Sequence, residues 1–235
     1  MSSRIAPRTR RPGTQGGFTL IEAAMATVII GVGVLAMIDA QSAFIRANLW
    51  SNHAASATFL ANEIREYTRL LPRHDPVSGL VIDGGVLYGW GPDEGEITVD
   101  DFDDLDDFDG ITFSGFGSPD WADGDLPGPI DAFGTVIPEI TLDGVELGAS
   151  MDDGSGQIVF AGEAMNGWSQ TVEVDKIDPF DTAIVYAPEY FEGPVGVDPG
   201  RPVDSFPLRV TVRVFYQSAA DPLPSEVIAV TWIVP

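Results

Sequence analysis

The N-terminal part of the chain contains a long apolar run with a single charge inside it. The run extends over 21 residues, from Phe18 to Ile38, and Glu22 is its only charged residue. As an α-helix with a rise of about 1.5 Å per residue, it would reach about 30 Å, enough to cross a bilayer. A carboxylate inside a bilayer costs roughly 2.5–3.5 kcal/mol on insertion scales, so Glu22 needs a partner. Because no basic residue lies within the run, the nearest cation would be a new α-amino group on Phe18, formed by a cut after Gly17.

The residues around this cut resemble the prepilin signature of type IV pilins and type II secretion pseudopilins. The resemblance covers about residues 8–40: an arginine-containing leader (residues 1–17), then Phe18, a Thr-Leu-Ile-Glu segment that ends at Glu22, and the apolar helix. It implies that a prepilin peptidase cuts after Gly17 and methylates the Phe18 amine. It also implies that Glu22 attracts the Phe18 amine of a neighbouring pilin or pseudopilin subunit, while an inner-membrane assembly platform builds the filament.

Two other interpretations of the run are an ordinary signal anchor and a cleaved secretory signal. In a signal anchor, Glu22 would have no role and would be present by chance. A secretory signal has an apolar region of about 7–15 residues followed by a small-residue cleavage site. Here the run is longer, and Ile38-Asp39-Ala40 at its end is a poor cleavage site. The four arginines before the run predict a single-pass inner-membrane protein whose N-terminus is cytoplasmic and whose remainder is exported, to a filament or the cell surface.

The chain is strongly acidic. Its 36 acidic and 12 basic residues give a formal net charge of −24, and four of the basic residues belong to the leader. Phosphate binding needs clustered Lys and Arg, so this charge argues against nucleic acid and anionic lipid as partners. The chain has no cysteine. Exported compartments permit disulfides without requiring them, so their absence does not indicate a reducing compartment.

The apolar run continues into an amphipathic segment. Residues 39–71 contain no Gly or Pro, and Pro72 follows them. Apolar side chains recur in this segment at the 3–4 residue spacing of one helix face. They are Trp50, Ala54, Ala57, Leu60, Ile64, Tyr67 and Leu71. We predict one helix over residues 18–71, with residues 18–38 in a membrane and the second half packed under a sheet. The alternative is two helices, with a break near residues 48–52.

Residues 72–235 have the composition of one exported β-rich domain. A tight hairpin around Asp-Gly is predicted at residues 81–88, followed by a loop-rich stretch over 89–156. Alternating apolar and polar residues predict strands at 168–175 and 206–216. Residues 227–234 are apolar on both faces, which favours a central or doubly covered strand, and they are predicted to pair with the preceding strand as a hairpin. The fold class is therefore α+β: a long N-terminal helix packed on a C-terminal antiparallel sheet, with a loop-rich middle.

Support for catalysis is thin. The only histidines, His53 and His74, are far apart in the sequence and there is no cysteine, which argues against a zinc site. We interpret them as helix-surface or helix-end residues. Lys176, the only lysine, is interpreted as a solvated charge. The chain is predicted not to be an enzyme and to require no cofactor.

An acidic run is the other prominent motif, over residues 100–110. Its aspartates are spaced by an apolar residue at every third position, and clustered carboxylates repel unless a cation joins them. The candidate ligands for Ca²⁺ are Asp101, Asp103, Asp104, Asp106, Asp107 and Asp109. The pattern is not an EF-hand, but it resembles a segment of minor pilins of the mannose-sensitive haemagglutinin and PilV types. The equal alternative is a solvated acidic loop whose Phe102, Leu105 and Phe108 pack against the sheet.

The function that these features favour is that of a minor pilin or pseudopilin. Such a subunit would initiate, cap or decorate a type IV pilus or a type II secretion filament. A major subunit is less favoured, because a domain of this size with long loops would crowd a dense helical array. The alternative is an exported enzyme or Ca²⁺-dependent binding module that uses the helix only as a tether. A mere tether, however, does not need Gly17 and Glu22.

Overall fold

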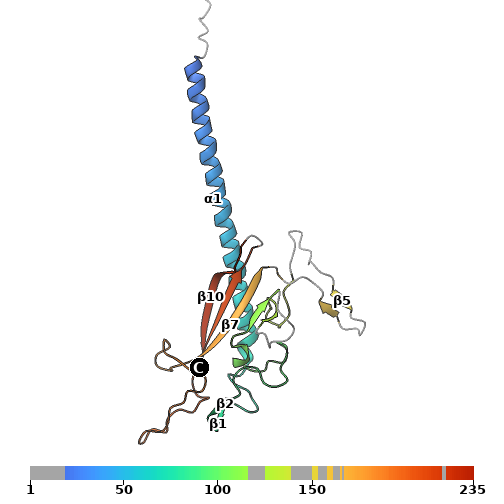
Figure 1. The fold of residues 1–235 in the computed structure, drawn as a ribbon, viewed down its shortest axis with the longest axis vertical. Coiled ribbons are helices and arrows are strands. Elements are labelled where there is room, and N and C mark those ends of the chain that lie inside the picture. Colours follow the sequence, from blue (N-terminus) through green and yellow to red (C-terminus); the bar gives the residue numbers. More distant parts are fainter. Residues whose placement is uncertain are drawn as a thin grey trace, which may run out of the picture. The chain divides into compact units, whose positions relative to one another are not determined.

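The computed structural model describes residues 19–115, 125–138, 150–152, 158–160, 165, 167–218 and 221–235. The chain divides into two compact units, Met1–Trp50 and Ser51–Pro235, and each is considered by itself. One helix, α1 (Leu20–Tyr67), contributes residues to both (Figure 1).

The helix is continuous, as predicted, and the alternative of a break near residues 48–52 is wrong. A short 3₁₀ turn, η1 (Thr68–Leu70), follows it, and Leu71 is extended with φ −72° and ψ 143°. Pro72 explains this end, because a proline ring disfavours the helical conformation of the residue before it. Between Leu20 and Trp50 the large apolar side chains are exposed. By length and composition, the helix is apolar enough to span a membrane.

The second half of α1 packs on the sheet of the Ser51–Pro235 unit. Its buried residues are Ala57, Leu60, Ala61 and Ile64, which belong to the predicted stripe or adjoin it. Tyr67 and Leu71 are half-buried against the same core. Trp50, which we also assigned to the stripe, is 72% exposed.

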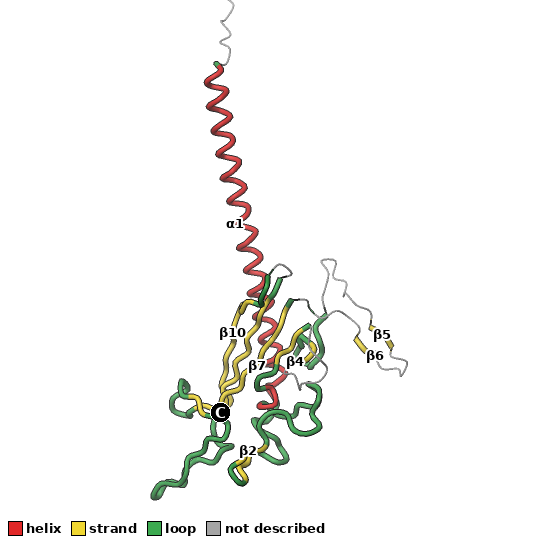
Figure 2. Tube along the Cα trace, in the orientation of Figure 1, coloured by secondary structure: helices red, strands yellow, loops and turns green. Residues whose placement is uncertain are grey.

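The main sheet has the strand order β10-β9-β7-β3-β4 (Figures 1 and 2). Its strands are β3 (Thr112–Ser114), β4 (Asp125–Pro127), β7 (Trp168–Ile177), β9 (Leu208–Tyr216) and β10 (Ser225–Val234), with β8 (Val185–Tyr186) also paired to β7. The α+β class is confirmed, and the two long strands predicted from alternation lie next to each other as β7 and β9. The pairing is antiparallel throughout except between β3 and β4, which are parallel.

The last strand, β10, was predicted to be central or covered on both faces, and it is instead at one edge of this sheet with an exposed outer face. It pairs with β9 as the predicted hairpin. Its Val230, Trp232 and Val234 pack against the core, whereas Thr231 and Ile233 on the opposite face are exposed. The outward face carries few charges, so its composition resembles that of a strand covered on both sides.

Two smaller hairpins lie outside the main sheet (Figure 2). One consists of β1 (Val81–Asp83) and β2 (Val86–Tyr88), at the predicted position. Its turn residues Gly84 and Gly85 have φ of 60° and 86°, the left-handed values that a type I′ turn requires. The other consists of β5 (Ser150–Asp152) and β6 (Ile158–Phe160).

A buried glutamine fastens the helix to the sheet. Gln170 on β7 donates from Nε2 to the carbonyl oxygens of Leu60 (2.8 Å) and Ile130 (3.1 Å), and its Oε1 accepts the Ile130 N–H (2.8 Å). Both polar ends of this fully buried side chain are therefore satisfied, which is the condition for placing an amide in a core.

Candidate functional site

The two processing residues, Gly17 and Phe18, lie outside the described residues. The third N-terminal candidate, Glu22, lies in the first turn of α1. One of its carboxylate oxygens accepts hydrogen bonds from the N–H and the hydroxyl of Thr19, both at 2.9 Å, and the Thr19 hydroxyl accepts the Glu22 N–H at 3.3 Å. This reciprocal arrangement is a capping box, which satisfies N–H groups that the start of a helix leaves free. The carboxylate is thereby held next to the residue that follows Phe18.

The six candidate aspartates of the acidic run do not form one site. Asp101 is exposed and accepts the N–H groups of Ile97 and Thr98, so it closes a local turn. Asp109 accepts the Val174 N–H (2.9 Å) and the Trp90 indole N–H (3.1 Å), and so joins the loop to β7. Both carboxylates have structural partners of their own.

The remaining candidates gather around a short 3₁₀ turn, η2 (Asp106–Phe108). Asp104, Asp106 and Asp107 are buried, and ligand atoms of the three lie within 4.8 Å of one another. A second group of the same tightness joins Asp107 to Asp103 and to a residue that sequence reasoning missed, Glu96. Phe102, Leu105 and Phe108 are buried in the core, as expected, but the burial of three aspartates contradicts a fully solvated loop.

Backbone amides orient two of these carboxylates. Asp104 Oδ1 accepts the N–H groups of Asp106 (2.8 Å) and Asp107 (3.2 Å). Asp107 Oδ2 accepts the N–H groups of Asp103 and Asp104, both at 3.1 Å. One oxygen of each carboxylate is fixed in this way, which leaves the other oxygen to face a neighbouring acid or a ligand.

Burial makes the ionised forms of these acids unfavourable. It raises the pKa of Asp104 to about 9, and the Asp106 carboxylate beside it adds to the rise. Burial also raises the pKa of Asp106 and of Asp107 to about 7, with further repulsion from Asp107 and Asp104 respectively. Near neutral pH such a group holds protons or binds a cation, because its negative charges repel one another away from water.

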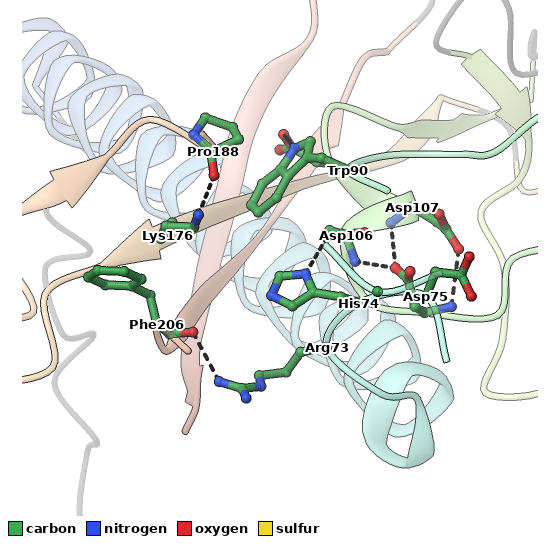
Figure 3. Close-up of polar contacts among 12 residues, drawn as sticks. Arg73, His74, Asp75, Trp90, Asp106, Asp107, Lys176, Pro188 and Phe206 are labelled. Carbon is green, nitrogen blue, oxygen red and sulfur yellow. Dashed lines mark hydrogen bonds and ion pairs between the residues drawn. The ribbon is translucent and has the colours of Figure 1, made fainter. Parts of the chain in front are cut away.

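A buried histidine adjoins the aspartates (Figure 3). His74 Nδ1 lies 2.5 Å from Asp106 Oδ2, and burial lowers the pKa of His74 to about 4. The imidazole is therefore neutral at pH 7, and a hydrogen bond joins Nδ1 to the Asp106 carboxyl group. Our interpretation of His74 as a helix-end residue missed this contact. The sequence around residue 74 has no periodic pattern that would predict the contact with Asp106.

The only lysine is buried as well, so its interpretation as a solvated charge is wrong. Lys176 is 1% exposed, and its ammonium donates to the carbonyl oxygen of Pro188 (Figure 3) and to that of Tyr190. It lies over the rings of Phe206 and Trp90, 5.5 and 5.9 Å from their centroids. Burial lowers its pKa to about 8. A signal for this was present in the sequence, since residue 176 has the same parity along the strand as the buried Val172 and Val174.

Comparison of the chain with protein-family models, with curated proteins and with solved structures finds no match. What the protein does is therefore inferred from its own residues and their geometry.

Proposed function

We propose that this chain is a minor pilin or pseudopilin, a structural subunit that enters a membrane-derived filament through the N-terminal half of α1. The observation that carries the proposal is Glu22. It is the only charge of the run from Phe18 to Ile38, and its carboxylate is folded back onto Thr19 at the start of the helix.

The position of that carboxylate suits the chemistry of a cut after Gly17. Such a cut would leave a positively charged amine on Phe18, the residue that precedes Thr19. The amine and Glu22 would then be opposite charges at the same end of an apolar helix. When such helices pack side by side, the amine of one subunit can pair with Glu22 of the next, so that neither charge is left alone in an apolar bundle.

The charge of the chain supports the predicted orientation. Its arginine-containing leader would remain in the cytoplasm, and the acidic domain would be exported. In this arrangement the chain is first a single-pass inner-membrane protein, and its partners are a prepilin peptidase, an assembly platform and other subunits. A domain with long loops fits the end or the outside of a filament better than its repeating body.

The first test concerns processing. The chain is produced in a host that contains a prepilin peptidase, and the mature N-terminus is read by mass spectrometry. We expect Phe18 with one added methyl group. Gly17→Leu should block the cut, because the peptidase needs a small residue there, whereas Gly16→Leu is the matched control and should be cut. A mature chain that retains its leader would overturn the proposal.

The second test separates the charge of Glu22 from its capping role. Glu22→Gln keeps a side-chain oxygen that can accept the Thr19 N–H, so the capping box and processing should survive. The Phe18 amine would lose its partner, at a cost of about 3–5 kcal/mol, which is more than a hundredfold in an equilibrium. We expect filament incorporation to be lost. Asp39→Asn removes one exposed charge from the same helix and should incorporate normally.

Normal incorporation of Glu22→Gln would mean that the residue only caps the helix. The tether interpretation would then be preferred, since an anchored enzyme or binding module needs the helix but not the charge.

A further inference from the structure

We propose that Asp104, Asp106 and Asp107, together with Asp103 and Glu96, form a Ca²⁺ site in the loop that precedes β3. Such a site is separate from the filament role, because it lies in the Ser51–Pro235 unit and uses no residue of the apolar run.

The position of the acids suggests one bound ion. Asp107 belongs to both groups of close carboxylates, the buried one with Asp104 and Asp106 and the more exposed one with Asp103 and Glu96. An ion near Asp107 would therefore meet buried oxygens on one side and a partly exposed acid on the other. The more exposed pair would give the ion a route in from solvent.

An independent observation points to a missing positive partner. Asp106 is 0% exposed, and its Oδ1 receives no hydrogen bond from any residue that the structure describes. The other oxygen, Oδ2, faces His74. A buried carboxylate oxygen without a donor is costly, and native structures generally satisfy such an atom with a ligand, a proton or a water molecule.

Among the residues that the structure describes, none of the nearby basic side chains donates to Asp106 Oδ1. Arg73 donates to the carbonyl oxygen of Phe206 (3.0 Å), and Lys176 donates to Pro188 and Tyr190. The third basic side chain, His74, forms its hydrogen bond with Asp106 Oδ2 and not with Oδ1. The charge of the cluster is therefore not matched by these side chains, and the remaining candidates are a cation or a proton shared between Asp104 and Asp106.

The donor atoms favour Ca²⁺ over other metals. All five candidate ligands are carboxylates, and hard oxygen ligands select Ca²⁺, Mg²⁺ or Mn²⁺ rather than Zn²⁺. Ca²⁺ accepts 6–8 oxygens at irregular positions, including both oxygens of one carboxylate, whereas Mg²⁺ requires near-octahedral geometry and keeps its water. His74 would not be a ligand. It would hold Asp106 in place, as outer-shell partners of metal ligands do.

Direct binding to the purified full-length chain in detergent micelles tests the site. Titration with CaCl₂ followed by calorimetry, at pH 7.5 and constant ionic strength, should give one Ca²⁺ per chain. The unfolding temperature should rise with CaCl₂ and rise less with MgCl₂. Because no filament is needed, a failure here leaves the proposed function untouched, and a failure of processing or incorporation leaves the site untouched.

Matched variants distinguish a site from general screening of an acidic chain. Asp107→Asn removes the shared ligand but keeps an oxygen that can accept the Asp103 and Asp104 N–H groups, and we expect Ca²⁺ affinity to fall at least about tenfold. Asp101→Asn removes the same charge from an exposed turn and should bind Ca²⁺ normally. If Asp107→Asn does not fold, Asp106→Asn takes its place, with the same expected loss.

Three results would overturn the site. Equal responses to CaCl₂, MgCl₂ and NaCl, or equal losses in Asp107→Asn and Asp101→Asn, would mean that ions only screen the charge. An absence of Ca²⁺ binding in the wild-type chain would leave a shared proton as the partner of Asp106.

Discussion

The two halves of α1 differ in whether the folded chain covers their apolar side chains. From Leu20 to Trp50 the large apolar side chains are exposed, and the helix segment has no buried residue. From Ser51 to Tyr67 the helix instead buries Ala57, Leu60, Ala61 and Ile64 beneath the sheet. An exposed apolar surface of this length is unfavourable in water. The first half therefore needs a cover from outside the described chain, such as lipid or other helices, whereas the second half obtains its cover from its own domain.

Each region also contains a charged side chain whose hydrogen-bond partners lie nearby. Glu22 accepts hydrogen bonds from Thr19, and Lys176 donates to two backbone carbonyl groups. The two differ in where an opposite charge or acceptor comes from. Lys176 has its acceptors within the folded domain, whereas Glu22 would gain a positive partner only from a new amine at Phe18 of its own or a neighbouring chain. Stability should thus depend on Lys176 and assembly on Glu22.

The largest effect should come from removing packing in the second half of α1. Leu60 is fully buried, and Leu60→Ala should lower the free energy of unfolding by about 2–5 kcal/mol, through lost burial and the cavity left behind. Leu35→Ala is the matched control in the exposed half and should change it by less than about 0.5 kcal/mol. Denaturant unfolding of the full chain in micelles, followed by tryptophan fluorescence, measures both. Equal losses would contradict the division of α1 into a self-covered and an uncovered half.

A smaller effect is expected at the polar contact between α1 and the sheet. Gln170→Ala would leave buried groups of Leu60 and Ile130 without partners and should cost about 1–3 kcal/mol for the unsatisfied groups. Gln217 provides the control, because its half-buried side chain donates to the Asp221 carbonyl oxygen and to no core group that the structure describes. Gln217→Ala should have almost no effect in the same unfolding assay. A silent Gln170→Ala would mean that water replaces the amide.

The comparison also shows which elements the sequence could predict. Long periodic patterns of apolar residues identified α1, β7 and β9. A period of 3.6 or 2 over many residues indicates a helix or a strand without any knowledge of tertiary contacts. The three-residue strands β3 and β4 have no such length, and their pairing depends on contacts far along the chain. The predicted position of β10 in the sheet was wrong for a related reason, because composition indicates how apolar a strand face is but not whether another element covers it.

The acidic run illustrates the same limit at the level of a site. The sequence alone could not distinguish the six candidate aspartates from one another. In the structure, Asp101 and Asp109 accept hydrogen bonds from backbone and indole N–H groups, whereas the buried group lies around Asp107. Glu96 and His74 approach that group through tertiary structure. Lys176 is the exception, since its parity along β7 already indicated an inward side chain.

The pH dependence of stability tests how the domain satisfies its buried charge. Burial lowers the pKa of Lys176 from 10.5 to about 8, so between these values the unfolded chain binds more protons than the folded chain. The contribution of Lys176 to stability should therefore increase as the pH rises from 8 to 10. Lys176→Met removes this contribution, and unfolding free energies measured across that interval should rise less steeply with pH. An unchanged slope would indicate that the ammonium is hydrated.

The smallest change in the free energy of unfolding should come from substitutions on the exposed face of the second half of α1. Glu66 and Arg69 form an ion pair at 3.2 Å, and both side chains are exposed. Water screens such a pair, and ordering two long side chains opposes it, so Glu66→Ala should cost no more than about 0.5 kcal/mol. The loss should disappear in about 1 M NaCl, where the Debye length is only about 3 Å. A loss comparable with that of Leu60→Ala would mean that this face is also covered, and that the two halves of α1 differ less than their exposure suggests.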